Sequence, residues 1–231
     1  MTVAAVVVAA GSGERLGAGR PKALVPLAGE PMVVHAVRAL WSAATVDDVV
    51  VVAGGEHCEE IAALLAAAGL DVAAVCAGGG TRQESVDRGL AACPRDADVV
   101  AVHDAARPLV SPALVDATVR ALVDSWAAVA PGLPVVDTLK LVDPAQSDRV
   151  VRTQDRRHLW AVQTPQVFAR GTLQQVHARL RGTAVTDDLG LVEAAGGRVR
   201  LVPGERANFK VTYPEDLVLA EALFAARAAP A

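Results

Sequence analysis

The chain has 231 residues, of which 52% are hydrophobic and 21% charged, a balance typical of a folded protein and unlike that of a disordered one. The formal net charge of −4 provides no overall attraction to nucleic acid or to an anionic membrane, so any anion site must be local. The three cysteines, Cys58, Cys76 and Cys93, form no C-x-x-C pair, which argues against a disulfide framework and a zinc finger. The opening apolar run is too short to cross a bilayer. We therefore expect a soluble cytoplasmic protein that binds neither nucleic acid nor membrane.

The first half of the chain alternates β-branched runs with helical patterns. The continuous apolar run Val3–Val8 is typical of a strand buried on both faces, and Pro31 suits the first turn of a helix. Such alternation predicts β-α-β units and a doubly wound, mostly parallel sheet with helices on both faces, a Rossmann-like α/β fold. The strands expected here are Val3–Val8, Asp48–Val52, Val72–Cys76 and Asp98–Val102, and the helices begin at Pro31, near Ile61, at Arg82 (to Ala92) and at Ser111 or Pro112.

The alternation stops after Pro131, where two β-rich runs, Val135–Val142 and Arg149–Thr153, flank the turn-like segment Asp143–Asp148. A lone two-stranded hairpin is marginally stable in water, so this one is expected to pack on a second copy of the chain. The doubly wound pattern resumes with a helix over Asp187–Ala195, a strand over Arg198–Val202, an extended segment over Asn208–Thr212 and a helix from Pro214. We expect one domain over residues 1–231 with a β-arm inserted at about 132–158.

A glycine-rich segment, residues 9–22, follows the first strand, at the strand end where ligands bind in such folds. Leu16 stands where a dinucleotide-binding fingerprint needs glycine, and Lys22 is not part of a Gly-Lys-Ser/Thr loop, so both common nucleotide motifs fail. A dehydrogenase is disfavoured further because the second strand ends Val51-Val-Ala-Gly without an acidic residue. What remains is a glycine turn with Arg15, Arg20 and Lys22, which indicates either a polyanion site or a solvated surface loop.

Five further motifs extend this pattern. They are Gly78–Ser85, Val102–Pro108, Trp160–Gln166, Thr186–Asp188 and Asn208–Thr212, in this order. Together with the glycine segment they resemble the 2-C-methyl-D-erythritol 4-phosphate cytidylyltransferase family over nearly the whole chain. The resemblance implies a nucleotidyltransferase fold and transfer of CMP from CTP to methylerythritol phosphate with release of pyrophosphate, in non-mevalonate isoprenoid precursor biosynthesis.

The resemblance also implies roles on the nucleotide side. Arg15 and Lys22 would be the catalytic cations at the α-phosphate, and Asp104 would be the carboxylate that binds Mg²⁺. From its position alone, Asp104 at a strand end could equally be a helix N-cap or a turn residue, and His103 beside it is expected to be structural. The residues expected to bind the nucleotide are Ala10, Gly11, Gly13, Gly79, Arg82, Ser85 and Ala105.

On the acceptor side, the resemblance implies that the polyol phosphate is bound by Arg107, Thr138, Arg156, Thr164, Thr186 and Lys210. Thr138, Arg156 and Thr164 lie on or just after the arm and would complete the site of a partner subunit, which makes a homodimer the expected assembly. The alternatives are a cytidylyltransferase acting on ribitol 5-phosphate and a non-catalytic nucleotide-binding protein. Two residues depart from the family pattern: Glu14, where a second basic residue is common and for which Arg20 could substitute, and Gly80, where an acidic residue is common.

Overall fold

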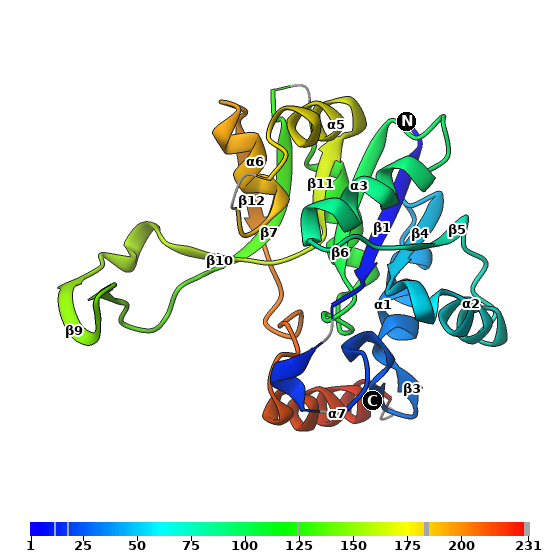
Figure 1. Ribbon diagram of the computed structural model, residues 1–231, viewed down its shortest axis with the longest axis horizontal. Helices are drawn as coiled ribbons and strands as arrows, with labels where there is room; N and C mark the ends of the chain where they lie inside the picture. The colour runs from blue at the N-terminus through cyan, green and yellow to red at the C-terminus, as the bar shows by residue number, and fades with distance from the viewer. Residues whose placement is uncertain (12, 18, 124, 183–184, 229–231) are drawn as a thin grey trace.

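A mixed, mostly parallel sheet runs through the middle of the molecule, with helices on both faces (Figure 1). This computed structural model describes residues 1–11, 13–17, 19–123, 125–182 and 185–228. The sheet follows the order β10-β7-β11-β6-β1-β4-β5, and β12 pairs with β7. Its strands are β1 (Val3–Ala9), β4 (Asp48–Ala53), β5 (Ala74–Ala77), β6 (Val99–Asp104), β7 (Ala128–Pro134), β10 (Trp160–Val162), β11 (Gln166–Ala169) and β12 (Val199–Pro203).

The four strands expected in the first half are present and pair in parallel, which confirms the doubly wound pattern. Three strands of this sheet, β7, β10 and β11, were not expected. β7 contains Pro131 and Gly132, both poor strand formers, and it is held by tertiary pairing on both sides: with β12 in parallel and with β10 and β11 antiparallel. β11 pairs antiparallel with β6. The sheet is therefore mixed on this side.

The two faces of the sheet carry separate apolar cores, because successive side chains of β1 point to opposite faces. Val3, Ala5 and Val7 join one core, and Ala4 and Val6 join the other. The first core packs under α1 (Met32–Trp41), α2 (Cys58–Ala67) and α4 (Pro112–Arg120). The second packs under α3 (Arg82–Ala92), α5 (Arg170–Arg179) and α6 (Asp188–Ala194).

A third, smaller core lies beside the glycine-rich segment and anchors its middle through Leu16. Leu16 and Leu27 pack there against Val211 and against Ala220 of α7 (Pro214–Ala228). The short strands β2 (Pro26–Leu27) and β3 (Glu30–Pro31) border it. The segment Asn208–Thr212 lies outside every strand, and the N–H of Val211 donates to the carbonyl of Ala106 at 2.8 Å, which holds this segment beside the end of β6.

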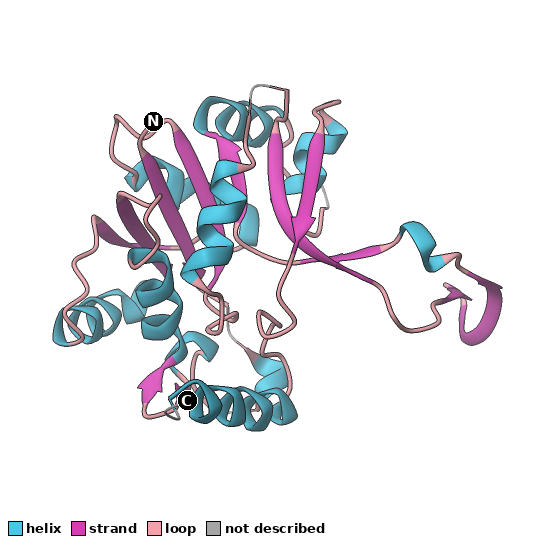
Figure 2. Ribbon diagram, turned by 180° about the vertical axis from the view of Figure 1, so that it is seen from behind, coloured by secondary structure: helices cyan, strands magenta, loops and turns pink. Residues whose placement is uncertain are grey.

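The arm leaves the sheet after β7 and returns at β10. It carries the hairpin of β8 (Lys140–Asp143) and β9 (Gln146–Thr153), and it projects from the body of the molecule in both views (Figures 1 and 2). Several of its apolar side chains are exposed to solvent: Val136, Leu139, Leu141, Val142, Val150 and Val151. The inserted arm expected from the sequence is thus present. Among the described residues, no helix is both long and apolar enough to cross a membrane.

The strand order changes direction at β1. From β1 the chain passes to β4 and β5 on one side and then crosses to β6 on the other. The carboxyl ends of β1 and β6 lie side by side there, with Val8 opposite Asp104. Ligands of open α/β sheets bind at such a switch point, because the loops that leave the two strands diverge and open a crevice.

Candidate active site

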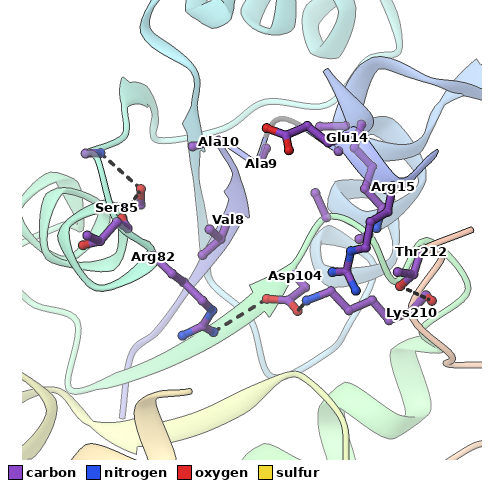
Figure 3. A pocket seen from close by; sticks show the side chains of 18 of the residues that line it. Val8, Ala9, Ala10, Glu14, Arg15, Arg82, Ser85, Asp104, Lys210 and Thr212 are labelled. Atoms are coloured by element: carbon purple, nitrogen blue, oxygen red, sulfur yellow. Dashed lines mark hydrogen bonds and ion pairs between the residues drawn. The ribbon is translucent and has the colours of Figure 1, made fainter. Parts of the chain in front are cut away.

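A cavity of about 730 Å³ opens at the switch point between β1 and β6 (Figure 3). It is lined by the glycine-rich segment, the Gly79–Ser85 loop, the end of β6 and the segment with Lys210. Eleven of the residues expected to form the site line it: Ala10, Gly11, Gly13, Arg15, Lys22, Gly79, Arg82, Ser85, Asp104, Ala105 and Lys210. Segments more than a hundred residues apart in sequence therefore meet at the predicted place.

Asp104 lies at the centre of this cavity between two cations (Figure 3). Nζ of Lys210 is 2.7 Å from Oδ2 of Asp104, and a guanidinium nitrogen of Arg82 is 3.6 Å from Oδ1. Burial by itself would raise the pKa of Asp104, but the positive charges of Arg82 and Lys210 outweigh it and lower the pKa to about 2. The carboxylate is ionised at every physiological pH, and its N-cap alternative does not apply because no helix begins at it.

Lys22 adds a further cation to the same wall. Partial burial, together with the charges of Lys210 and Arg15, lowers the pKa of Lys22 to about 8. The guanidinium of Arg15 lies 5.9 Å from the ring centroid of Tyr213, a cation–π contact that holds it over the cavity. The cations outnumber the carboxylates around Asp104, so the cavity is suited to a polyanion even though the whole chain is acidic.

The glycine turn is shaped by a close approach between Gly13 and Lys22. Gly13 has a φ of +73°, and a Cβ there would lie 2.4 Å from Cβ of Lys22, so a larger residue would push the lysine away. Ser12 and Ala18 of the glycine-rich segment lie outside the described residues. Arg20 pairs with Glu60 at 3.4 Å and lines a neighbouring hollow instead, so the expectation that it substitutes for a basic residue at position 14 is not supported by the geometry.

The Gly79–Ser85 loop is held from behind by the start of α3. Thr81 caps the helix by accepting from the N–H of Glu84, whose carboxylate in turn accepts from the N–H groups of Gly80 and Thr81. The buried hydroxyl of Ser85 donates to the carbonyl of Thr81 at 2.9 Å and accepts from the N–H of Gly79 at 3.1 Å. Ser85 thus fixes the turn from inside the protein. A Cβ at Gly79 would lie 2.3 Å from Cβ of Glu84, so this turn also requires glycine.

Thr164 occupies a different place from the one expected. Its side chain is buried in the body of its own chain and not on the arm, and it accepts from the N–H of Asp104 at 3.1 Å. Its Oγ1 lies 2.9 Å from Nδ1 of His103, whose Nε2 faces the carbonyl of Arg107 at 3.2 Å. Since a carbonyl only accepts, Nε2 carries the proton and Thr164 donates to Nδ1. Burial lowers the pKa of His103 to about 4, so this neutral imidazole braces the end of β6, as expected of a structural residue.

The other residues expected on the acceptor side do not line this cavity. Arg107 donates to the carbonyls of Asn208 at 2.8 Å and Val162 at 3.3 Å, which ties the end of β6 to the segment that carries Lys210. Thr186 borders a second hollow behind Arg82. Thr138 and Arg156 are exposed on the arm, where Arg156 donates to the carbonyl of Val136. Thr81 and Thr212 also line the cavity; each lies inside one of the motifs but was not expected to be a site residue.

Three comparisons with known proteins agree with one another. Residues 3–226 match the family model described as IspD, 2-C-methyl-D-erythritol 4-phosphate cytidylyltransferase. The chain is 50% identical to the 2-C-methyl-D-erythritol 4-phosphate cytidylyltransferase of Streptomyces avermitilis, over 97% of this chain and 92% of that one. Its fold is similar to the crystal structures of 4-diphosphocytidyl-2C-methyl-D-erythritol synthase from Anaerococcus prevotii (TM-score 0.83, 27% identity, 97% and 96% of the two chains) and of the cytidylyltransferase from Thermus thermophilus (TM-score 0.75, 37% identity, 96% and 98%).

Proposed function

The chain belongs to the 2-C-methyl-D-erythritol 4-phosphate cytidylyltransferase family, and from that membership we propose that the cavity between β1 and β6 is its active site. The enzyme transfers CMP from CTP to 2-C-methyl-D-erythritol 4-phosphate, which yields 4-diphosphocytidyl-2-C-methyl-D-erythritol and pyrophosphate in the non-mevalonate pathway to isoprenoid precursors. The observation that carries the assignment of the site is the group of four cations, Arg15, Lys22, Arg82 and Lys210, around one ionised carboxylate.

The proposed chemistry is an in-line attack by a phosphate oxygen of the acceptor on the α-phosphorus of CTP. Both reactants are anions, so the barrier includes their mutual repulsion, and fixed cations lower it most where the charge is concentrated in the transition state. Arg15 and Lys22 lie on the segment that follows β1 and face the cavity, where they would neutralise the α-phosphate. The acceptor phosphate is already ionised, so the site needs no general base, in keeping with the neutral, buried His103.

The carboxylate of Asp104 fits a magnesium ion held mainly by substrate. Among the described residues, no three side chains of His, Cys, Asp or Glu gather at one point, so the protein by itself offers no complete set of metal ligands here. Mg²⁺ is commonly bound by one or two carboxylates together with substrate phosphates, and at this site it would supply positive charge that offsets the charge of CTP. Asp104 would hold it, and Lys210, which pairs with Asp104 here, would turn to the phosphate of the acceptor.

For the nucleotide, the proposed contacts come from both loops. The turn of Ala10, Gly11 and Gly13 would surround the triphosphate, while Gly79, Arg82 and Ala105 would face the base and ribose. The role proposed for Ser85 is indirect: its hydroxyl holds Gly79 in place, so the backbone of the turn presents the groups that read cytosine.

The assembly that we propose is a homodimer in which each arm packs on the other subunit. The exposed apolar side chains of β8 and β9 support it, because a projecting hairpin with such a surface is stable only when it is covered. Thr138 and Arg156 on the arm would then complete the acceptor site of the partner, which explains why neither lines the cavity of its own chain. We also propose that the chain forms one domain with its arm and that it is located in the cytoplasm. The three free cysteines support this location.

The test of this function is pyrophosphate release from CTP and Mg²⁺ with two acceptors in parallel. We expect release with 2-C-methyl-D-erythritol 4-phosphate and none above background with ribitol 5-phosphate, since the two differ in the branching methyl group and chain length that the acceptor site reads. An Asp104→Asn variant is the matched control, because it keeps the shape of the side chain and removes its charge. Equal release with both acceptors, or full activity of the Asp104→Asn variant, would contradict the proposed site.

A further inference from the structure

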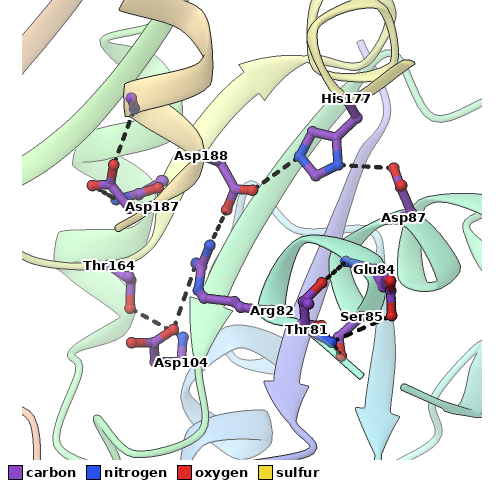
Figure 4. Close-up of polar contacts among 12 residues, drawn as sticks. Thr81, Arg82, Glu84, Ser85, Asp87, Asp104, Thr164, His177, Asp187 and Asp188 are labelled. Carbon is purple, nitrogen blue, oxygen red and sulfur yellow. Dashed lines mark hydrogen bonds and ion pairs between the residues drawn. The ribbon is translucent and has the colours of Figure 1, made fainter. Parts of the chain in front are cut away.

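A buried histidine lies where helices α3, α5 and α6 meet (Figure 4). It is behind the nucleotide wall, the side of the cavity formed by Arg82 and the rest of the Gly79–Ser85 loop. His177 of α5 is only 1% exposed. Its Nδ1 is 2.8 Å from Oδ1 of Asp87 on α3, and its Nε2 is 2.9 Å from Oδ1 of Asp188 at the start of α6. The reaction as described above leaves both His177 and Asp188 without a role.

The contacts of His177 determine its protonation state. Both neighbouring atoms are carboxylate oxygens, which only accept, so both ring nitrogens donate and the side chain is an imidazolium. Burial by itself would lower the pKa of His177, but the hydrogen bonds and charges of Asp188 and Asp87 outweigh it and raise the pKa. The buried carboxyl of Asp188 correspondingly keeps a lowered pKa, because His177 and Arg82 compensate for its burial.

The two carboxylate oxygens of Asp188 accept hydrogen bonds from two different residues, His177 and Arg82. Oδ1 accepts from His177, while Oδ2 accepts from Nη1 of Arg82 at 2.6 Å. The second guanidinium nitrogen of Arg82 points into the cavity, 3.6 Å from Oδ1 of Asp104 (Figure 4). Alternating charges therefore run without a gap from Asp87 through His177, Asp188 and Arg82 to the carboxylate of Asp104.

The separation of 3.6 Å between Arg82 and Asp104 matters for binding. An arginine beside a carboxylate tends to close into a bidentate pair, which would occupy both oxygens of Asp104. Here Nη1 of Arg82 donates to Asp188 and is therefore kept away from Asp104. Asp188 cannot turn, because its other oxygen accepts from His177. Because His177 fixes Asp188, Arg82 stays extended along the cavity wall, and Asp104 remains accessible from the cavity.

We infer that His177 is a positioning residue for the nucleotide site: through Asp188 it holds Arg82 in the conformation that receives CTP. The inference rests on the proposed place of Arg82 in that site. It assigns a function to the Thr186–Asp188 motif and to a histidine of α5 that are both outside the cavity.

Two substitutions of His177 separate its two hydrogen bonds. The amide nitrogen of His177→Gln reaches the place of Nε2 and keeps the bond to Asp188, whereas that of His177→Asn reaches the place of Nδ1 and keeps only the bond to Asp87. Both variants lose the imidazolium, so both lose some thermal stability. We expect His177→Asn to raise the KM for CTP about ten- to a hundredfold with a smaller change in kcat, and His177→Gln to retain most of the wild-type KM. An Asp87→Asn variant, on the far side of the histidine, is expected to leave the KM for CTP near that of the wild type.

A double-mutant cycle with Arg82→Ala decides the route of the effect. If His177 acts through Arg82, His177→Asn causes no further loss of kcat/KM in the Arg82→Ala background, although it still lowers Tm there. The inference is wrong if Arg82→Ala raises the KM for CTP and His177→Asn does not. It is also wrong if the losses of kcat/KM from the two substitutions multiply. In both cases the proposed position of Arg82 in the nucleotide site still holds. If Arg82→Ala itself leaves the KM for CTP unchanged, the place of Arg82 and the inference both fail.

Should His177→Asn not fold, Asp188→Asn supplies the same readout, since the neutral amide offers Arg82 one weaker acceptor. A raised KM for CTP that is absent in the Arg82→Ala background supports the inference. An unchanged KM overturns it.

Discussion

The protonation states of single residues follow from burial and neighbouring charge in this site. Asp104 stays ionised because cations surround it, and His103 stays neutral because it is buried with a hydroxyl and a carbonyl as partners. Lys22 differs from these two residues, because burial and the charges of Lys210 and Arg15 lower the pKa of its ammonium group to about 8. The charge of Lys22 therefore changes close to the physiological pH range.

The first prediction concerns the pH dependence of the reaction. Lys22 acts as a cation, so its contribution is present below its pKa and is lost as the pH rises through about 8. We expect kcat/KM for CTP to fall on the alkaline side of this value in steady-state measurements of pyrophosphate release. Lys22→Arg retains a charge throughout, so its alkaline limb should disappear or move to higher pH. A wild-type profile that stays flat from about pH 7 to about pH 9.5 would contradict the role of Lys22.

The second prediction separates catalysis from stability at the same residue. Lys22→Ala should lower kcat by about 10²- to 10³-fold, the effect of removing one preorganised charge from a transition state. The free energy of unfolding should change by less than about 0.5 kcal/mol, because the lysine is only half-buried and its lowered pKa shows that the fold does not favour its charge. Arg20→Ala is the matched control on the same segment: its partner is the exposed Glu60, so activity should stay near that of the wild type. A large drop in Tm for Lys22→Ala in a thermal melt followed by circular dichroism would count against this assignment.

Among the secondary-structure elements, α3 does the most to build the nucleotide wall. Its first turn carries the capping box of Thr81 and Glu84, which also closes the Gly78–Gly80 turn. The same start of the helix supplies Arg82 and the Ser85 hydroxyl that holds Gly79. The helix start and the binding loop are therefore one structural unit, and the local signals that end the loop also orient it.

The third prediction tests this coupling with two helix caps. Thr81→Ala removes the cap of α3 and should cost about 1 kcal/mol of unfolding free energy while raising the KM for CTP several-fold, because the loop beside it loosens. Ser111→Ala removes the cap of α4, away from the cavity: the Ser111 hydroxyl accepts from the N–H of Leu114 at 3.0 Å and also donates to Glu205 at 2.5 Å. This variant should cost at least as much free energy in urea unfolding and leave the KM for CTP unchanged. Equal KM values for both variants would show that the cap of α3 does not position the loop.

For the molecule as a whole, the proposed homodimer would make two chains contribute to one site. The hairpin of the arm extends away from the body (Figure 2), so in that proposal the arm residues would reach a cavity in the partner subunit. The sheet and its two cores are complete without the arm, which separates the requirements for folding from those for catalysis.

The fourth prediction is complementation between inactive subunits. Lys22→Ala and Arg156→Ala should each be inactive alone. In a dimer with shared sites, however, a mixed pair contains one site with neither change. After random exchange of subunits we expect about a quarter of the wild-type activity, since half of the dimers are mixed and each has one intact site of two. Mixing Lys22→Ala with Arg15→Ala is the control and should restore nothing, because both residues belong to the same chain's cavity. No recovery in the first mixture, with exchange verified by tagged subunits, would exclude a shared site.

The sequence by itself was sufficient for the elements whose signals are local. The apolar runs of β1, β4, β5 and β6, the start of α3 at Arg82 and the glycine-rich segment with its cations were all predicted, because periodicity, caps and glycine turns depend on neighbours along the chain. These elements also predicted where the cavity lies, because ligands of open α/β sheets bind beyond the carboxyl ends of the strands.

The tertiary structure alone decided the features that depend on contacts between distant segments. β7 forms by pairing against poor local propensity, and Thr164 is buried beside Asp104 although it follows the arm in sequence. The hydrogen bonds of Asp188 with His177 and with Arg82 join three helices, and no periodicity or spacing in the sequence records them. Local interactions act between residues a few positions apart and leave a pattern in the sequence, whereas the burial and charge of a side chain are set by whichever segments the fold brings against it.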